Sequence, residues 1–202
     1  KSVTERTRPA RMTRFSHRFR VLAVRLGGLM IKLGQYLSTR LDVLPPELTK
    51  GLAGLQDEVP PVDFAAMREL AEAELGSSLE AVYEGFDERP IAAASLGQAY
   101  KARLKADDAR AAGFADVVVK IQRPGIGGIV AVDLEALRTV ARRLSKFRLI
   151  NSRADVPALM EEFAHTSLEE VDYLMEGAHA ERFAGLFEGQ DHVRVPRVVW
   201  ER

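Results

Sequence analysis

Residues 92–120 read AAASLGQAYKARLKADDARAAGFADVVVK, and this stretch decides the fold. Short alternating or valine-rich runs separated by turn residues are typical of paired strands. The pattern predicts three short strands, at Ile91–Ala94, Gln98–Leu104 and Val117–Ile121. Between the last two, Asp107 to Ala115 holds Gly113 among small and charged residues, which favours a hairpin loop. A small antiparallel sheet is therefore expected in the middle of the chain.

Helical patterns flank this sheet on both sides. Before it we expect a long helix from about residue 12 to Arg40, a second from Pro45–Pro46 to about Gln56, a third at Phe64–Leu75 and a short one at 79–85. Asp63 and Gly76 are a typical cap and stop for the third helix. After the sheet we expect a helix at about Gly128–Lys146, a helical stretch from Asp155 to about Phe187 with a break near His165–Ser167, and two strands at Val193–Val195 and Val198–Trp200. The predicted class is α+β, with a five-stranded antiparallel sheet and added N-terminal helices.

The composition excludes several classes of protein. The 202 residues are 47% apolar and 29% charged, which is typical of a globular protein, and they include no cysteine. A disulfide scaffold, a cysteine nucleophile and a thiolate metal site are therefore excluded. Lys+Arg and Asp+Glu both number 29, so the formal net charge is zero and a strongly basic nucleic-acid binder is disfavoured. No apolar stretch reaches the roughly 20 residues of a transmembrane helix. We expect a cytoplasmic or organellar-matrix protein, with peripheral membrane contact as the alternative. The chain begins at Lys1 without methionine, which favours a processed or trimmed end.

The first 25 residues are strongly basic, with eight basic side chains against Glu5. From about residue 12, apolar side chains recur at helical spacing, at Met12, Phe15, Phe19, Leu22, Leu26, Leu29 and Leu33. Arginines follow the same spacing on another face, at Arg11, Arg14, Arg18 and Arg25. Two interpretations stay open: a core stripe with a solvated basic face, or contact with an anionic membrane surface.

Residues 92–120 also include candidate functional side chains. When AAASLGQA is aligned with the kinase loop G-x-G-x-x-G-x-V, Ala92 and Ala94 take the first two glycine positions, Gly97 the third and Ala99 the valine. Lys120 ends an apolar strand one hairpin later, where burial is costly unless an anionic group meets the ammonium. Such a site also needs a helical glutamate, and Glu176 is the candidate, with Asp172 on the same helix face. A packed turn, a solvated lysine and a solvated acidic helix are the structural alternatives.

Two further motifs indicate a specific protein family. Residues 31–40 read IKLGQYLSTR, with Leu-Pro-Pro following at 44–46, and residues 170–176 read EVDYLME. Together with the alanine-rich run, these motifs resemble those of the ABC1/UbiB (AarF, ADCK) family of atypical kinase-like proteins. The resemblance runs from about Gly27 to Trp200 with its motifs in family order.

The resemblance implies a helical family extension at 1–85 and a protein-kinase-like small lobe at 86–202. It implies that Lys120 contacts nucleotide phosphates and pairs with Glu176, and that the other nucleotide-binding residues are Ala92, Ala93, Ala94, Ser95, Gly97 and Gln98. It also implies a regulatory latch, in which Lys32 and Gln35 meet Glu170 and Asp172. The implied cofactor is ATP or ADP with Mg²⁺, and the implied role is in quinone (ubiquinone-type) biosynthesis or lipid homeostasis. The expected partners are a nucleotide and either anionic membrane lipid or quinone-pathway proteins, and no nucleic-acid partner is expected.

The sequence departs from the family pattern in two places. Gly27-Gly28 stands where the family has Gly-Pro, and the catalytic-loop Asp, its Asn and the metal-binding Asp have no matching position. We therefore expect no catalytic or metal residue in this chain, the large lobe to be absent and the fragment alone to be inactive. The alternative is a non-catalytic module that binds membrane lipid or a partner through its helices. An ordinary protein-kinase small lobe is disfavoured by the alanine-rich run and by the 31–40 motif. The four histidines lack metal-ligand spacing, and no G-x-S-x-G elbow is present.

Overall fold

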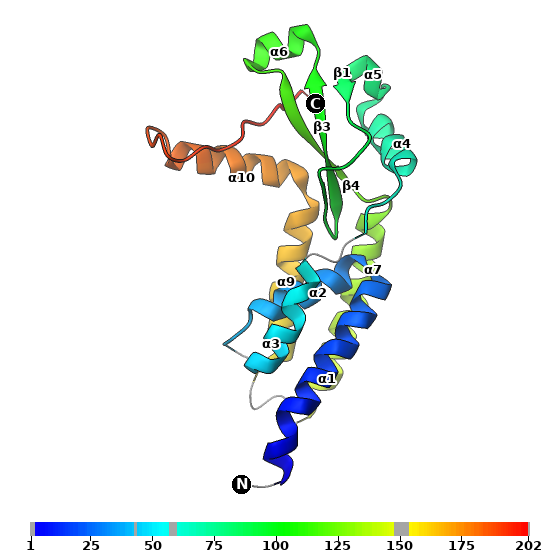
Figure 1. The fold of residues 1–202 in the computed structure, drawn as a ribbon, viewed down its shortest axis with the longest axis vertical. Coiled ribbons are helices and arrows are strands. Elements are labelled where there is room, and N and C mark those ends of the chain that lie inside the picture. The colour runs from blue at the N-terminus through cyan, green and yellow to red at the C-terminus, as the bar shows by residue number, and fades with distance from the viewer. Residues whose placement is uncertain (1–2, 43, 57–59, 148–153, 202) are drawn as a thin grey trace. The chain divides into compact units, whose positions relative to one another are not determined.

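A computed structural model describes residues 3–42, 44–56, 60–147 and 154–201 of the chain (Figure 1). In chain order the elements are α1 (Val3–Leu26), α2 (Gly28–Thr39), α3 (Pro46–Leu52), the 3₁₀ turn η1 (Ala53–Gln56), α4 (Phe64–Leu75), α5 (Leu79–Val82), β1 (Tyr83–Phe86), β2 (Ala92–Ala93), β3 (Gly97–Leu104), α6 (Ala106–Ala112), β4 (Asp116–Gln122), α7 (Ile126–Leu144), α9 (Val156–Val171) and α10 (Tyr173–Leu186). These elements form two compact units that interleave along the chain. Unit 1 comprises Lys1–Pro61, Ala93–Leu96 and Gly125–Ser167, and unit 2 comprises Val62–Ala92, Gly97–Pro124 and Leu168–Arg202. The predicted domain boundary, between a helical extension at 1–85 and a small lobe at 86–202, stays a prediction.

Unit 1 is helical, and small residues let its helices approach closely. Its N-terminal helices pack around a buried cluster of Ala23, Ile31, Leu52 and Leu55. A Cβ on Gly51 would lie 2.6 Å from the Cβ of Ser16, so α3 can lie against α1 only because position 51 has no side chain. Among the described residues, no helix combines the length and the apolar composition needed to cross a membrane.

The predicted long first helix is in fact two helices. Gly27 has φ of 70°, a left-handed conformation that glycine adopts freely, and it separates α1 from α2. The predicted apolar stripe is also divided. Leu29 and Leu33 are buried, whereas Phe15, Leu22 and Leu26 are 60%, 47% and 62% exposed. The core interpretation therefore holds for only part of the stripe.

Unit 2 is built on an antiparallel sheet with β3 at its centre. β3 pairs with β4 along one edge, from Gly97↔Gln122 to Arg103↔Asp116, and β1 and β2 lie along the other edge. Alternate β3 residues point to opposite faces. Tyr100, Ala102 and Leu104 are buried in a core with residues of α4 and α5, including Met67 and Leu79. The other face of the β3–β4 hairpin is more exposed and holds the candidate site.

The sheet has four strands among the described residues, not the five predicted. The predicted helix 79–85 ends at Val82, because Tyr83 and Phe86 form β1 and join an aromatic cluster with Tyr100. The predicted strands at 193–195 and 198–200 lie outside regular structure. Pro196 has no N–H to donate to a strand ladder, which accounts for part of this difference.

Two local predictions also need correction. The expected loop at 107–115 contains the helix α6, which has two aspartates in its first turn and ends at Gly113 with φ of 82°. The expected break near His165–Ser167 lies instead at Asp172, whose carboxylate caps α10 by accepting a hydrogen bond from the Met175 amide at 3.0 Å. By contrast, α4 has the predicted bounds, and Gly76 ends it with φ of 64°. Asp63 precedes the helix as predicted, but its side chain makes no capping hydrogen bond.

Candidate functional site

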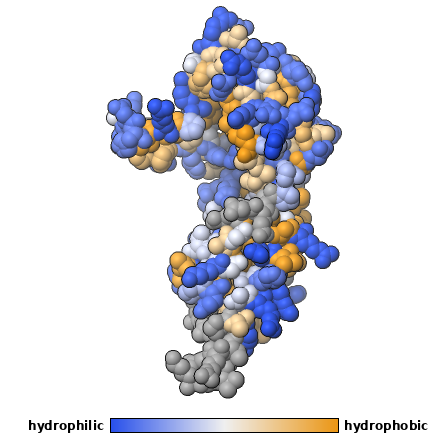
Figure 2. Space-filling view, in the orientation of Figure 1, coloured by the Kyte–Doolittle hydropathy of each residue, from blue (hydrophilic) through white to orange (hydrophobic). Residues whose placement is uncertain are grey.

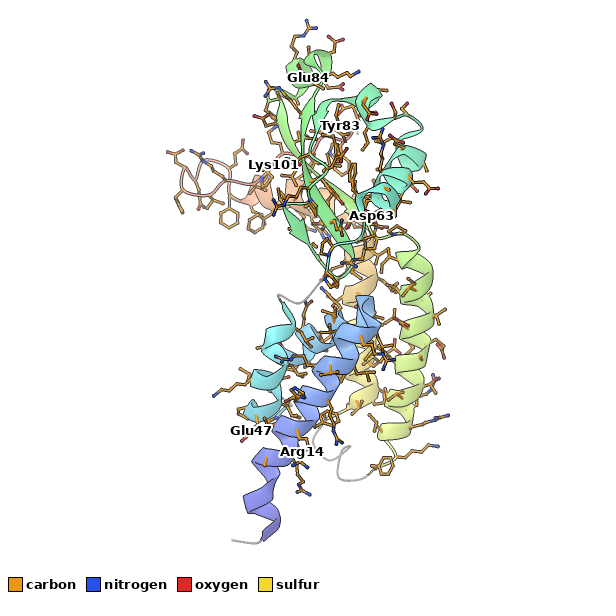
Figure 3. The ribbon with its side chains drawn as sticks, turned by 45° about the vertical axis from the view of Figure 1, so that its right-hand side comes forward. Arg14, Glu47, Asp63, Tyr83, Glu84 and Lys101 are labelled. Atoms are coloured by element: carbon orange, nitrogen blue, oxygen red, sulfur yellow. The ribbon has the colours of Figure 1, made fainter. Side chains whose placement is uncertain are left out.

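The exposed side of the β3–β4 hairpin, here named the open face, carries Ala99, Lys101, Val118 and Lys120. The strand register places Ala99 opposite Lys120 and Lys101 opposite Val118, so these four side chains share one face. Val118 is 62% exposed. Figure 3 shows Lys101 on β3, while the buried Tyr83 belongs to the core on the other face. The open face therefore presents ammonium groups beside an apolar strip.

Lys120 and Glu176 form an ion pair at this face. The Lys120 Nζ lies 2.7 Å from Glu176 Oε1 and also contacts Oε2, so the carboxylate holds the ammonium with both oxygens. Glu176 lies in the first turn of α10, 56 residues further along the chain. The side chains are 45% and 51% exposed, which leaves the ammonium within reach of a ligand. The structure thus brings together the pair that the sequence analysis expected.

Tyr173 completes the surroundings of Lys120. The Lys120 Nζ lies 4.4 Å from the centre of the Tyr173 ring, within the range of a cation–π contact. Burial raises the pKa of the Tyr173 phenol to about 12, with further contributions from the negative charges of Glu176 and Glu170. Its hydroxyl is buried and has no hydrogen-bond partner among the described residues. Tyr173 belongs to the 170–176 motif but has no predicted role, although it lies three residues before Glu176 on the same helix face.

Gly97 begins β3 directly beside this tyrosine. A Cβ at position 97 would overlap the Tyr173 hydroxyl and would lie 2.8 Å from the Ile121 carbonyl oxygen. Only glycine therefore fits where β3, β4 and α10 meet. At the same end of the hairpin, the Gln122 side chain donates a hydrogen bond to the Val171 carbonyl. These contacts fix the start of α10 against the hairpin.

The other predicted nucleotide-binding residues are divided between the two units. Ala92 belongs with Gly97 to unit 2, whereas Ala93, Ala94 and Ser95 belong to unit 1. Gln98 is 1% exposed and faces the core, where its amide bonds to both backbone groups of Val62 and to the Tyr100 hydroxyl. The side chain of Gln98 is therefore committed to the core and does not reach the open face, which argues against its predicted role in nucleotide binding.

The predicted latch residues lie in separate units, and their mutual contact stays a prediction. In unit 1, the Gln35 side chain donates to the Leu55 carbonyl at 3.3 Å, which ties α2 to η1. Lys32 lies on α2, while Glu170 and Asp172 belong to unit 2. Asp172 has a structural task as the cap of α10.

The end of the 31–40 motif binds α9 within unit 1. Arg40 donates to both carboxylate oxygens of Glu162, at 2.8 and 2.7 Å, and to the Tyr36 hydroxyl at 2.7 Å. The Tyr36 ring packs on Phe163 with a centroid distance of 5.4 Å. Tyr36 and Arg40 belong to the 31–40 motif, but these contacts could not be predicted from it, because Arg40 and its partner Glu162 lie 122 residues apart.

A separate cavity of about 420 Å³ lies elsewhere in unit 2. Its walls come from α6, α10 and residues 196–201, and Trp200 and Phe114 are among them. The indole N–H of Trp200 donates to Glu181 of α10. No residue predicted for the site lines this cavity.

Comparisons with known proteins find a family model, curated relatives and a solved structure that are similar to this chain. A family model described as the ABC1 atypical kinase-like domain matches residues 54–202. The Arabidopsis thaliana protein ACTIVITY OF BC1 COMPLEX KINASE 8, chloroplastic, is 42% identical over 180 residues, covering 88% of this chain and 23% of that protein. Probable protein kinase UbiB of Aeromonas hydrophila is 38% identical over 184 residues, covering 91% of this chain and 33% of that protein. The chain thus spans no more than a third of either relative.

One solved structure is also similar. It is the complex of Rv3197 with erythromycin from Mycobacterium tuberculosis, which matches with a TM-score of 0.55 and 29% sequence identity. The match covers 98% of this chain and 48% of that one.

Proposed function

This chain belongs to the ABC1 atypical kinase-like family, and from that membership we propose that it binds ATP or ADP at the open face of its β3–β4 hairpin. The observation that carries the proposal is the Lys120–Glu176 ion pair, with Nζ and Oε1 2.7 Å apart. In kinase-like sites a strand lysine, oriented by a helical glutamate, contacts the nucleotide phosphates. Lys120 and Glu176 have those positions, on β4 and α10.

Each neighbouring group has a task in this proposal. The Lys120 ammonium contacts phosphate oxygens, and Glu176 fixes its position. Because Gly97 has no Cβ, the start of β3 can pack directly against the Tyr173 hydroxyl and the Ile121 carbonyl oxygen. Ala99 and Val118 offer an apolar strip for the base. Together these residues bind and orient a nucleotide.

We assign no magnesium site within the described residues. Within the described part of the chain, no group of three or more His, Cys, Asp and Glu side chains could hold a metal ion. We therefore derive no step of phosphoryl transfer from this chain.

The proposed biological setting follows from the relatives. One is named a probable protein kinase UbiB, and another is named a chloroplastic ABC1 kinase. We propose that the chain serves an atypical kinase or ATPase of the UbiB type, acting in quinone biosynthesis or lipid homeostasis.

Calorimetric titration with ATP and ADP, with and without Mg²⁺, tests the binding proposal. Lys120→Met should weaken binding about ten- to hundredfold, because a hydrogen bond from a charged group is worth about 1.5–3 kcal/mol. Lys105→Met is the matched control, since Lys105 is an exposed lysine at the start of α6, away from the open face. Binding that is equally strong in both variants, or absent from the native chain, would contradict the proposal.

A second candidate function rests on α1. Phe15, Leu22 and Leu26 recur at spacings of seven and four residues, so they form one exposed apolar stripe on this helix. The arginines bordering it are Arg11, Arg18 and Arg25. Figure 2 shows hydrophobic side chains beside hydrophilic ones over the helices of this unit. An apolar stripe bordered by arginine suits the surface of an anionic membrane.

Co-sedimentation with vesicles tests this second function. The native chain should pellet with vesicles rich in phosphatidylglycerol, less so at high salt, and not with pure phosphatidylcholine. Leu22→Glu should abolish pelleting, whereas Val132→Glu on α7 should not, although Val132 is 70% exposed. Equal loss in the two variants would show that α1 has no special part in membrane contact.

A further inference from the structure

The hydroxyl of Tyr173 is an unexplained group at the open face. It is buried without a hydrogen-bond partner in the part of the chain that the structure describes, which costs the free energy of removing it from water. Phenylalanine would give the same ring without that cost. The presence of tyrosine instead of phenylalanine at position 173 therefore needs an explanation other than packing of the ring.

The ring of Tyr173 lies against the ammonium of Lys120. The distance from Nζ to the ring centre is 4.4 Å, and the same ammonium contacts both carboxylate oxygens of Glu176. Tyr173 and Glu176 are three residues apart in the first turn of α10, so one turn of helix supplies both groups that hold Lys120. The negative face of an aromatic ring attracts a cation from a second direction.

The hydroxyl of Tyr173 lies against Gly97, at the start of β3. A side chain at position 97 would overlap this hydroxyl, so the phenol fills the space that a Cβ would need. Asp172 and Gln122 fix the start of α10 next to this contact. Through Tyr173, α10 thus contacts both Lys120 and the backbone at the start of β3.

We propose that Tyr173 is a positioning residue of the nucleotide site, whose ring holds the Lys120 ammonium in place while its hydroxyl sets the spacing between α10 and Gly97. The inference rests on the proposed nucleotide binding, because its consequence is the presentation of Lys120 to phosphate. Tyr173 itself touches no reacting atom. The contact predicts that binding depends on the charge distribution of the ring as well as on its shape.

A series of fluorinated rings separates charge from shape. Tyr173→Phe is followed by phenylalanines carrying increasing numbers of fluorine atoms, which keep the shape of the ring and progressively remove its negative face. ATP affinity should fall stepwise along the series, by about two- to fivefold in total, because an exposed cation–π contact has that strength. Affinity that stays constant along the series would overturn the proposal, since packing alone would not respond to fluorination.

A measurement without nucleotide distinguishes failure of this inference from failure of the proposed function. The proton resonances of the Lys120 ε-methylene should show an aromatic ring-current shift in the native chain and in Tyr173→Phe, but not in Tyr173→Leu. If the shift is found and ATP does not bind, the nucleotide function fails while the contact stands. If the shift is absent from the native chain, the positioning role is refuted whatever the affinity for ATP.

The glycine contact has its own test. Gly97→Ala should lower the thermal stability of the native chain, and the loss should be smaller in the Tyr173→Phe background, where the hydroxyl is gone. Part of the loss should remain, because the new Cβ would still lie 2.8 Å from the Ile121 carbonyl oxygen. Equal losses in the two backgrounds would show that the hydroxyl does not set this spacing.

Discussion

Replacing Gly34 by alanine should destabilise unit 1, although alanine is the better helix former. Gly34 is the glycine of the IKLGQ motif and lies inside α2, where it is buried. A Cβ there would overlap Leu55 Cδ1 and would lie 3.2 Å from the ring of Phe19. Leu55 is fully buried between its neighbours and has little room to move. The missing side chain at position 34 is therefore what lets α2 lie against α1 and η1.

Two opposing terms give the expected size of the effect. Alanine gains about 1 kcal/mol over glycine inside a helix. Forcing an extra carbon into a packed core costs about 1–3 kcal/mol. Because the overlap is with a fully buried leucine, we expect a cost near the upper end and a net loss of about 1–2 kcal/mol. For a chain of this length that corresponds to a fall in Tm of about 2–8 °C.

Urea unfolding followed by circular dichroism measures the effect. Gly128→Ala is the matched control, because a Cβ at Gly128 in α7 would meet nothing within 4 Å and should raise stability slightly. The two glycine-to-alanine changes should thus act in opposite directions. If Gly34→Ala were as stable as Gly128→Ala, the packing argument would be refuted. Shortening Leu55 should reduce the cost at position 34, and independent effects of the two changes would also contradict it.

The remaining predictions concern Trp200, Tyr173 and Arg40. Gly177→Ala would place a Cβ 2.7 Å from the ring of Trp200, the chain's one tryptophan, and should shift the tryptophan fluorescence. In the control Gly185→Ala the new Cβ would meet nothing within 4 Å, and the fluorescence should not shift. Because the pKa of Tyr173 is raised to about 12 in the folded chain, this phenol ionises at lower pH in the unfolded chain. The free energy of unfolding, measured in urea, should therefore fall between pH 10 and 12, and it should fall less in a Tyr173→Phe variant. Arg40→Met should lower Tm through loss of the charged contact with both oxygens of Glu162, more at low salt than at high salt, and a salt-independent change would contradict this.

Local signals in the sequence were enough for several elements. The bounds of α4 were predicted from Asp63 and Gly76, and the structure ends this helix at Gly76 with a left-handed residue. The strands β3 and β4 lie within about one residue of their predicted bounds. These elements are encoded by nearest neighbours, through turn residues and side-chain periodicity.

Other elements depend on distant partners and were mispredicted. Tyr83 and Phe86 form a strand because they pair with β3 and pack with Tyr100, not because of their immediate neighbours. The residues from Val193 to Trp200 alternate like strands, yet they lie outside regular structure, and Trp200 bonds to Glu181 of α10. Strand propensity describes fit to a sheet, so it decides little where the pairing partner is unknown.

The sequence by itself determined the order of the motifs, the family and the pairing candidates Lys120 and Glu176. Only the tertiary structure decided which side chains meet. It turned Gln98 into the core, placed the Tyr173 ring on Lys120 and left Phe15 exposed. The reason is physical: residue type and spacing specify a local conformation, whereas a contact between residues 50 or more positions apart depends on how whole elements pack.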